Sequence, residues 1–184
     1  MSDEDESHRE DAAAVLARWQ ADHDAARALM RESGVAVRGP VAQLSGLELM
    51  QSLLRGERPY PPICDTLDFV LVEVGPGRAV FQGRPGVAHY NPMGTVHGGW
   101  FATLLDSAVG CAVQTSLPPG KAYTTAELKV NIVRPLTDRV PLVRAEGRVI
   151  HGGGRMATAD GRLTGPDGRL YAHASTTCFV FDAS

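Results

Sequence analysis

The sequence predicts an α+β fold built on a mostly antiparallel sheet. Strand-like segments occur as a group of two and a group of four, and one long apolar helix lies between the groups. Strands and helices do not alternate as they would in a parallel βαβ arrangement. With six strands and a single helix in this part of the chain, the helix must cover much of one sheet face and is expected to be buried.

Size and composition suit one compact domain with an extension. The 184 residues are 43% hydrophobic and carry a formal net charge of −3, so we expect a sizeable core and no nucleic-acid partner. Cys64, Cys111 and Cys178 are far apart and odd in number, which favours a reducing cytoplasm over a disulfide framework. No apolar run approaches the roughly 20 residues that span a bilayer, and the polar N-terminus is not a signal peptide, so no membrane partner is expected.

Three regions are expected along the chain. Residues 1–10 are acidic and polar, which is typical of a solvated tail. Residues 11–59 are expected to form a helical extension, and residues 60–184 the main domain. This division places all six strands and the long helix in one unit.

Two helices are predicted in the extension. Residues 11–33 lack glycine and proline and are rich in alanine, leucine and arginine, which favours a helix. A second, shorter helix is predicted after the N-cap Ser45, with Gly56 at its end. The first helix carries one amphipathic stripe, made of Val15, Leu16, Trp19, His23 and Ala26.

From about residue 65 the pattern changes to strands separated by glycine turns. GPG separates LDFVLVEVG from RAVFQGR, and HGGG and GPDG separate the last three strands. The strand AYTTAELKVNIVRP alternates, which predicts that one of its faces is formed by Ala122, Thr124, Ala126, Leu128, Val130 and Ile132.

The long helix is predicted over residues 97–116 and carries a single carboxylate. Its apolar positions follow the i, i+3, i+4 rule of a buried helix face. Asp106 points roughly 120° away from the centre of that face, so it belongs to the flank of the helix. A solvated aspartate on an exposed edge is one interpretation. The neighbouring residues on the flank are small and leave room beside the carboxylate, which favours a functional role for Asp106.

The start of this helix is rich in glycine. Gly94, Gly98 and Gly99 surround a helix N-terminus, where backbone N–H groups lack intrahelical partners and carry the positive end of the dipole. Glycines also let a substrate atom approach the backbone closely. The pattern fits an oxyanion hole for an acyl carbonyl, and it equally fits an ordinary glycine-rich helix entry.

Gly98 and Asp106 are too far apart to act on one carbonyl within a single chain. Eight residues at 1.5 Å per residue separate them by about 12 Å along the helix axis, whereas a base or nucleophile must come within about 3 Å of its target. The region therefore holds either no active site or one shared between two chains.

The motif Asn91-x-x-Gly94-x-x-His97-Gly98-Gly99, followed by Leu104-x-Asp106-x-Ala108, resembles the hotdog-fold acyl-CoA thioesterases of the phenylacetate-degradation (PaaI-like) type. The resemblance covers about residues 60–182. It implies a hotdog fold, in which an antiparallel sheet wraps around a long central helix, and assembly as a homodimer or homotetramer. It also implies hydrolysis of an acyl-CoA thioester at a site between subunits, without a cofactor.

The resemblance assigns roles to five residues. Asp106 resembles the catalytic carboxylate, acting as nucleophile or as general base, and Gly98 the amide that polarises the thioester carbonyl. Asn91 resembles a side chain that orients the carbonyl or the water, and Thr125 one that positions the water. His97 belongs to the motif, but its role is open and includes merely shaping the turn.

Residues that could bind the rest of the substrate are harder to identify. Gly99 lies beside the expected amide donor. Arg134 and Arg155 are candidates for the phosphates of CoA, and the glycines of HGGGR could offer further amides; a hairpin turn with a solvated arginine explains Arg155 equally well. No metal-ligand spacing is present.

Two other functions compete with the thioesterase. One is a hotdog hydratase or dehydratase, although those enzymes usually pair a carboxylate with a catalytic histidine on a different motif. The other is a non-catalytic acyl-CoA sensor that uses the N-terminal helices, although these helices show no basic recognition surface. The acyl group, the choice between dimer and tetramer, and the role of the N-terminal helices stay open.

Overall fold

The computed structural model describes residues 11–35 and 43–183, so the expected acidic tail lies outside the described residues. No described helix is long and apolar enough to cross a membrane. The elements in chain order are α1 (Ala12–Leu29), α3 (Gly46–Leu54), α4 (Ile63–Thr66), β1 (Phe69–Gly75), β2 (Arg78–Gly83), the 3-10 helix η1 (Val87–His89), α5 (Gly98–Thr115), β3 (Lys121–Ile132), β4 (Val143–Gly152), β5 (Met156–Thr164) and β6 (Leu170–Asp182).

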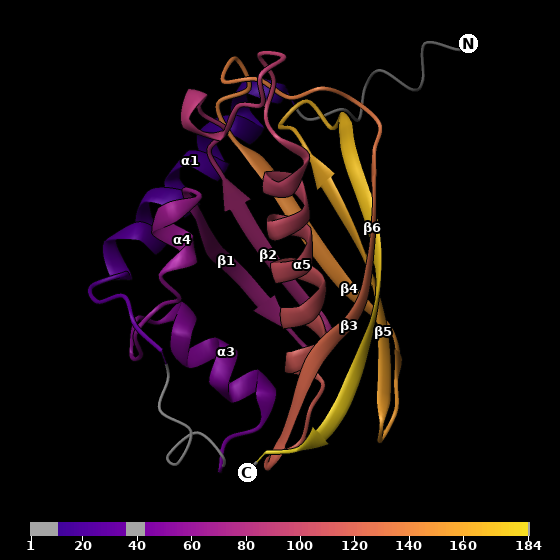
Figure 1. Ribbon diagram of the computed structural model, residues 1–184. Coiled ribbons are helices and arrows are strands. Elements are labelled where there is room, and N and C mark those ends of the chain that lie inside the picture. Colours follow the sequence, from indigo (N-terminus) through magenta and orange to yellow (C-terminus); the bar gives the residue numbers. More distant parts are fainter. Residues whose placement is uncertain (1–10, 36–42, 184) are drawn as a thin grey trace, which may run out of the picture.

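The six strands form one sheet with the order β1-β2-β4-β5-β6-β3, and each neighbouring pair is antiparallel. Helix α5 runs along one face of this sheet, as Figure 1 shows. β1 and β3 form its two edges. The structure therefore confirms the α+β prediction, including the chain order of two strands, one long helix and four strands, and the glycine turns between strands.

Helix α5 is buried against the sheet through the apolar face that the periodicity predicts. Its seven core residues are at most 1% exposed: Phe101, Leu104, Leu105, Ala108, Val109, Ala112 and Val113. Two glycines of the sheet allow the helix to come close. Gly147 of β4 pairs with Gly161 of β5, and a Cβ on Gly147 would lie 2.2 Å from the carbonyl oxygen of Ala108. The helix backbone thus rests directly on the sheet at this point.

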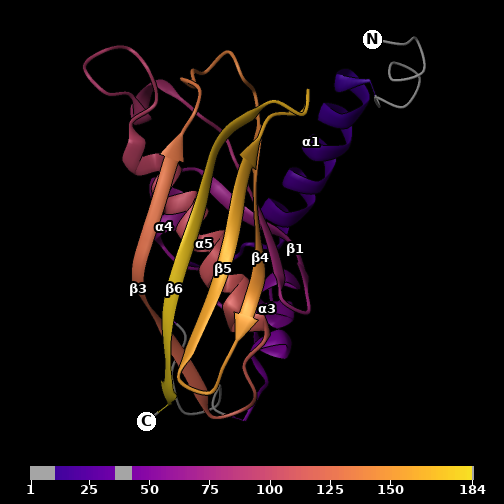
Figure 2. The ribbon, with the colours of Figure 1, turned by 90° about the vertical axis from the view of Figure 1, so that its right-hand side faces the viewer.

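The N-terminal helices pack on both sides of β1. Gln82 and Arg144 lie on the sheet face opposite α5, and Arg144 pairs with Asp22 of α1 at 2.5 Å and lies 4.8 Å from the ring centre of Trp19. Helix α3 instead packs beside α5, where the Gly46 N–H donates to the Leu117 carbonyl at 2.8 Å. Figure 2 shows α1 along the β1 and β4 side of the sheet. The extension therefore wraps around one edge of the sheet.

Three details differ from the sequence-based expectations. Helix α1 ends at Leu29 rather than at residue 33, and the short helices α4 and η1 were not predicted.

The prediction that one face of β3 is formed by every second residue from Ala122 to Ile132 is wrong, because a bulge between Thr125 and Glu127 shifts the register against β6. Leu128 and Val130 pack against the core, whereas Thr124, on the other side of the bulge, is exposed. An extra residue in a strand turns the side chains that follow it to the opposite face.

Candidate active site

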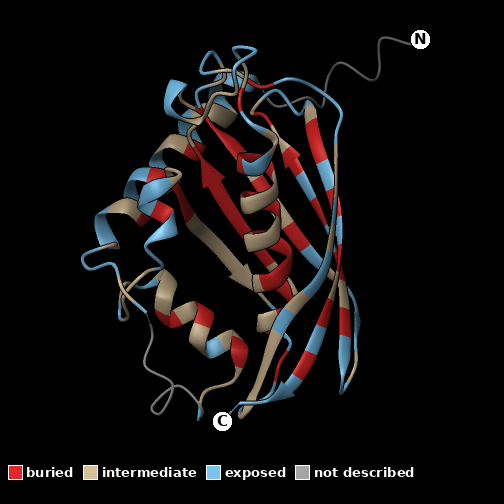
Figure 3. Ribbon diagram, viewed as in Figure 1, coloured by how far each residue is buried: buried red, intermediate tan, exposed pale blue. Residues whose placement is uncertain are grey.

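Asp106 lies on the flank of α5 that faces strand β3. The carboxylate is half-buried, and its Oδ1 atom accepts a hydrogen bond of 3.0 Å from the Thr125 hydroxyl. In Figure 3 the turns of α5 that face away from the sheet are mostly intermediate in burial, unlike the red strands behind them. Asp106 is therefore neither a core residue nor a freely solvated one.

The bulge in β3 is what directs Thr125 toward Asp106. Without the extra residue, Thr125 would share a face with Glu127 and Lys129, which are both exposed. The bulge brings Tyr123 and Thr125 to the same sheet face as Leu128. Both side chains then point toward α5 on successive turns of the helix.

Tyr123 is a residue of this site that the sequence analysis missed. A Cβ on Gly110 would lie 2.5 Å from the Tyr123 hydroxyl, so the tyrosine occupies the space that this glycine leaves. Burial raises the pKa of Tyr123 well above its usual value, with smaller contributions from Cys111, Cys178 and Asp106. The glycine spacing of α5, with Gly110 one turn after Asp106, was the available signal.

The N-terminus of α5 presents one free amide. His97 is the N-cap, and its Nδ1 atom accepts a hydrogen bond of 2.9 Å from the Gly99 N–H. The Trp100 N–H donates to the carbonyl of His97 at 3.0 Å. The Gly98 N–H has no hydrogen-bond partner in the described part of the chain. This leaves Gly98 with the unpaired donor that an oxyanion hole requires.

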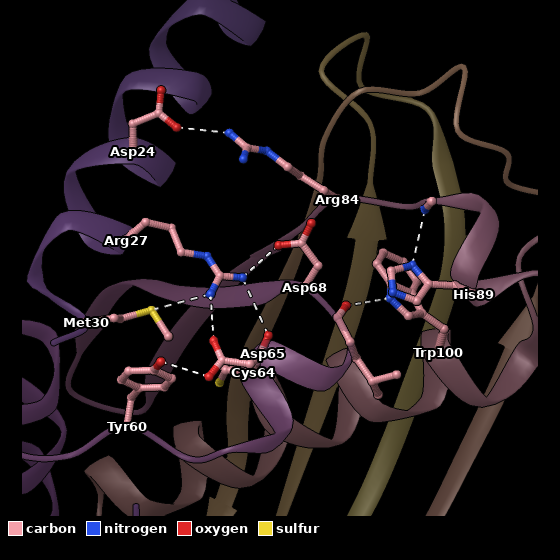
Figure 4. A network of polar contacts seen from close by, with 12 residues as sticks. Asp24, Arg27, Met30, Tyr60, Cys64, Asp65, Asp68, Arg84, His89 and Trp100 are labelled. Atoms are coloured by element: carbon pink, nitrogen blue, oxygen red, sulfur yellow. Dashed lines mark hydrogen bonds and ion pairs between the residues drawn. The ribbon is translucent and has the colours of Figure 1, made fainter. Parts of the chain in front are cut away.

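Two contacts hold the loop before α5 in place. The His89 carbonyl accepts from the His97 N–H at 2.8 Å, and the His89 ring stacks on Trp100 with centroids 5.6 Å apart. Trp100 in turn donates from Nε1 to the Leu67 carbonyl at 2.8 Å, and Figure 4 shows these rings beside each other. The start of α5 is therefore held by packing as well as by its cap.

Asn91 organises the tight loop that precedes the helix. Its Oδ1 atom accepts from the Met93 N–H at 2.9 Å, and its Nδ2 donates to the Thr95 hydroxyl at 3.0 Å. Gly94 adopts a φ of +80°, which favours glycine in this loop. The side-chain amide of Asn91 is thus engaged within the loop, and its expected role on the substrate stays a prediction.

The two candidate phosphate-binding arginines lie at opposite ends of the domain. Arg134 follows β3 near the start of α5, is exposed and donates to the Leu170 carbonyl at 2.8 Å. Arg155 is exposed in the turn between β4 and β5. Gly152, the last residue of β4 before this turn, lies near the other end of α5, because a Cβ on it would be 4.0 Å from the hydroxyl of Ser116, the residue that follows the helix. One chain does not bring the two arginines together.

Gly99, Gly98 and His97 lie together at one end of α5, and Asp106 with Thr125 lies about 12 Å farther along the helix axis. The structure therefore holds two polar half-sites on one helix. One half provides a carboxylate with a hydroxyl beside it, and the other provides a free amide at a helix N-terminus. Together they would suffice to hydrolyse an activated acyl group, but one chain does not bring them within reach of a common carbonyl.

Comparison with known proteins identifies the family. The sequence model of the thioesterase superfamily matches residues 93–172, which include both half-sites. No curated protein matches the chain significantly in sequence. Among solved structures, a phenylacetic acid degradation-related protein from Ralstonia eutropha is 30% identical, with a TM-score of 0.64, and the match covers 71% of this chain and 98% of that one.

Two further structures agree. A thioesterase family protein from Silicibacter pomeroyi is 26% identical, with 66% of this chain and 90% of that chain covered and a TM-score of 0.61. A variant of the phenylacetic acid degradation protein PaaI from Thermus thermophilus is 28% identical, with 64% and 97% covered and a TM-score of 0.57. Because a relative 30% identical is matched over almost its whole length, this chain belongs to the thioesterase superfamily and is a PaaI-like hotdog thioesterase.

Proposed function

We propose that the protein hydrolyses an acyl-CoA thioester to a free acid and CoA at an active site shared between two copies of the chain. The carboxylate of Asp106 acts from one copy, and the Gly98 N–H of the other polarises the thioester carbonyl. The observation that carries this proposal is the hydrogen bond from Thr125 to Asp106, since it orients a half-buried carboxylate on the open flank of the helix.

The chemistry needs few groups because a thioester is already activated. With Asp106 as general base, the carboxylate removes a proton from water, and the water oxygen attacks the carbonyl carbon. The oxyanion that forms accepts a hydrogen bond from the Gly98 N–H. The carbon–sulfur bond then breaks and releases the CoA thiolate, which takes up the proton that Asp106 removed from water. With Asp106 as nucleophile, a mixed anhydride forms first and water hydrolyses it.

The geometry of β3 supports a shared site. β3 is an edge strand that pairs only with β6 among the described strands, so its other edge can pair with a second copy. Thr125 lies beside Asp106, and a Cβ on Gly98 would lie 3.2 Å from Ile132 Cδ1. In an antiparallel pair of β3 strands centred between Leu128 and Lys129, Thr125 of one copy would face Ile132 of the other. Asp106 of one copy would then approach Gly98 of its partner.

A homodimer is therefore the smallest active assembly that we propose, and a homotetramer is compatible with it. We place the protein in the cytoplasm, because Cys64, Cys111 and Cys178 are all free thiols. The partner that the site fits is a small-molecule acyl-CoA, and the chemistry needs no cofactor.

The reaction is tested with a panel of acyl-CoAs and a thiol reagent that detects released CoA. Asp106→Asn should lower kcat by about 10³-fold, because an amide can neither remove a proton nor attack the carbonyl. Asp160→Asn, on the exposed outer face of β5, serves as the matched control and should leave the rate unchanged. No turnover across short, long and aromatic acyl groups would overturn the proposed function.

The shared site is tested by mixing two inactive variants. Gly98→Pro removes the amide hydrogen and keeps the helix start, since proline is favoured at the first helical position and His97 before it has an extended ψ of 140°. Its Cβ would lie 3.2 Å from Cδ1 of Ile132, the far end of a flexible side chain. In a heterodimer with the Asp106→Asn chain, one site carries both defects and the other carries neither. Mixing should restore up to about a quarter of the wild-type rate; no recovery despite heterodimer formation would contradict a shared site.

A further inference from the structure

We propose that the N-terminal extension forms a pocket for the far end of the acyl chain, so that α1, α3 and α4 select substrates by chain length. This inference rests on the proposed function, because it assigns the acyl group of the same substrate. The proposed reaction at the two half-sites on α5 uses no residue of the extension, and the pocket would give the extension a function.

The pocket is an apolar cavity between the extension and the domain core. Its volume is about 80 Å³, which is room for a few carbon atoms. The extension provides five of the twelve lining residues and residues 60–64, which run into α4, provide three, whereas β1, β2 and α5 close the pocket. The residues that line it are Ala26, Met30, Met50, Leu53, Leu54, Tyr60, Pro61, Cys64, Val70, Leu71, Phe81 and Cys111.

The chemistry of the walls suits an uncharged hydrocarbon. The only hydroxyl in the lining belongs to Tyr60, and it donates to Asp65 at 2.8 Å. Burial raises the pKa of the Cys64 thiol to about 11 and that of Cys111 to about 12, so both stay uncharged at neutral pH. Figure 4 shows Met30, Tyr60 and Cys64 gathered next to the Arg27 side chain. A charged or strongly polar group would lose its hydration here without gaining a partner.

Cys111 connects this pocket to the active site. It belongs to α5, as Asp106 does, and it lines the cavity. Its thiol lies close enough to both the Cys64 thiol and the Asp106 carboxylate for each of them to contribute to its raised pKa. The small residue Ser107 lies on the helix surface between Asp106 and Cys111, whereas the space beside Gly110 is filled by Tyr123. A chain attached to a carbonyl at Asp106 can therefore cross the helix at Ser107 and enter the pocket.

The helix geometry sets the length of chain that fits. Five residues separate Asp106 from Cys111, which places their side-chain ends roughly 10 Å apart on the helix surface. An extended alkyl chain advances by about 1.25 Å per carbon, given a carbon–carbon bond of about 1.5 Å. About eight carbons would bridge this distance, and the pocket would hold a few more. The preferred acyl groups should therefore have about eight to twelve carbons.

The extension is held firmly enough to act as a wall. Arg27 of α1 pairs with Asp68 at 2.7 Å and with Asp65 at 3.4 Å, and Arg84 pairs with Asp24 at 2.9 Å. The three solved relatives compared above are matched over 90–98% of their lengths, but the matches cover only 64–71% of this chain. The extension, which precedes the family match at residue 93, is thus a feature through which this chain can differ from them.

Variants that fill the pocket provide the test. Cys111→Leu and Ala26→Leu each add carbons to the cavity from a different element. We measure kcat/KM for saturated acyl-CoAs from two to sixteen carbons. For decanoyl-CoA both variants should lose about tenfold or more, since one methylene in an apolar pocket is worth about 10- to 200-fold, whereas butyryl-CoA should change less than about twofold. Ala17→Leu, on the exposed face of the same helix α1, is the matched control and should keep the wild-type profile.

A variant that enlarges the pocket makes the test independent of overpacking. Leu53→Ala should move the optimum toward longer chains. Folded filling variants that keep the wild-type chain-length profile would overturn the proposal, as would equal losses for short and long chains. If the wild type hydrolyses no acyl-CoA, the proposed function fails. The pocket is then judged by decanoic acid alone, which should raise the Tm of the wild type and not that of Cys111→Leu; an equal shift in both would refute it.

Discussion

The Thr125 hydroxyl donates a hydrogen bond of 3.0 Å to the Oδ1 atom of Asp106, and so joins strand β3 to the flank of α5. This contact depends on the bulge at residue 126, because only the extra residue places Thr125 and Leu128 on the same face. The carboxylate is therefore oriented by the strand that also forms the open edge of the sheet. β3 therefore both orients the Asp106 carboxylate and offers the edge at which we propose that a second copy pairs.

Removing the Thr125 hydroxyl should impair activity more than stability. A hydrogen bond to a charged group is worth about 1.5–3 kcal/mol, so Thr125→Val should lower kcat by about 10- to 100-fold. Thr125→Ser keeps the hydroxyl and should recover most of the rate. The measurement is steady-state hydrolysis together with urea unfolding. Equal rates for the valine and serine variants would show that the contact does not orient the catalytic carboxylate.

The buried histidine of α1 should make the protein sensitive to acid. His23 is 0% exposed, and neither of its ring nitrogens has a hydrogen-bond partner among the described residues. Its pKa is lowered from 6.5 to about 4, mainly by burial and next by the charge of Arg84. A histidine with a lowered pKa takes up its proton on unfolding, so its full contribution is present above pH 6.5 and is lost as the pH falls toward 4.

The loss in the free energy of unfolding should reach about 3 kcal/mol by pH 4, at 1.36 kcal/mol per pKa unit. Urea unfolding at several pH values between 7 and 4 measures it. In His23→Leu the decrease over this range should become smaller by that amount, whereas His173→Leu, on the exposed face of β6, should behave like the wild type. Parallel pH dependences for the wild type and His23→Leu would contradict this explanation.

The close approach of α5 to the sheet predicts a sharp difference between two glycines. A Cβ on Gly147 would lie 2.2 Å from the Ala108 carbonyl oxygen, whereas a Cβ on Gly154 would meet nothing within 4 Å. Gly147→Ala must therefore push the helix away from the sheet and should cost about 3 kcal/mol or more. Gly154→Ala should be neutral or slightly stabilising. Thermal unfolding of both variants checks this, and similar Tm values would be inconsistent with the packing described.

The regular parts of this fold could be predicted because their signals are local. The apolar period of α5 and the glycine turns are visible in the sequence, and the structure confirms them. The bulge in β3 left no such signal, since the small and apolar residues from Ala122 to Ile132 alternate without interruption. Only pairing with β6 creates the extra residue, and this is why Thr124 was expected on the wrong face and Tyr123 was missed.

The site could be predicted only in part, for a related reason. The flank position of Asp106 and its distance from Gly98 follow from the geometry of one helix. The burial of Trp19, His23 and Ala26 on the stripe of α1 also follows from periodicity. The surface on which this stripe packs cannot be predicted in the same way, because the sequence of an amphipathic helix carries no information about its partner. The pocket that includes Ala26 exists only after the extension has folded onto the sheet.

The docking of α1 should depend on Arg144. This residue pairs with Asp22 at 2.5 Å and with Glu73 at 2.8 Å. Its Nε and Nη2 atoms also each lie 2.8 Å from the side-chain amide oxygen of Gln82, when the amide of this buried residue is oriented so that all its hydrogen bonds are made. Arg144→Met keeps the apolar stem but leaves the Gln82 amide oxygen and the Asp22 carboxylate without their donor, whereas Glu73 keeps its ion pair with Arg78 at 2.7 Å.

Breaking such a network by removing one partner typically costs about 3–5 kcal/mol when the groups are buried, and the partial exposure of Asp22 and Glu73 should reduce this to about 2 kcal/mol here. Arg144→Met should therefore release α1 to trypsin faster than in the wild type. Arg148→Met removes an arginine that is 65% exposed from the same strand and should leave the digestion rate unchanged. If both variants are cleaved at the wild-type rate, apolar packing around Trp19 and Ala26 holds α1 in place without the ion pairs.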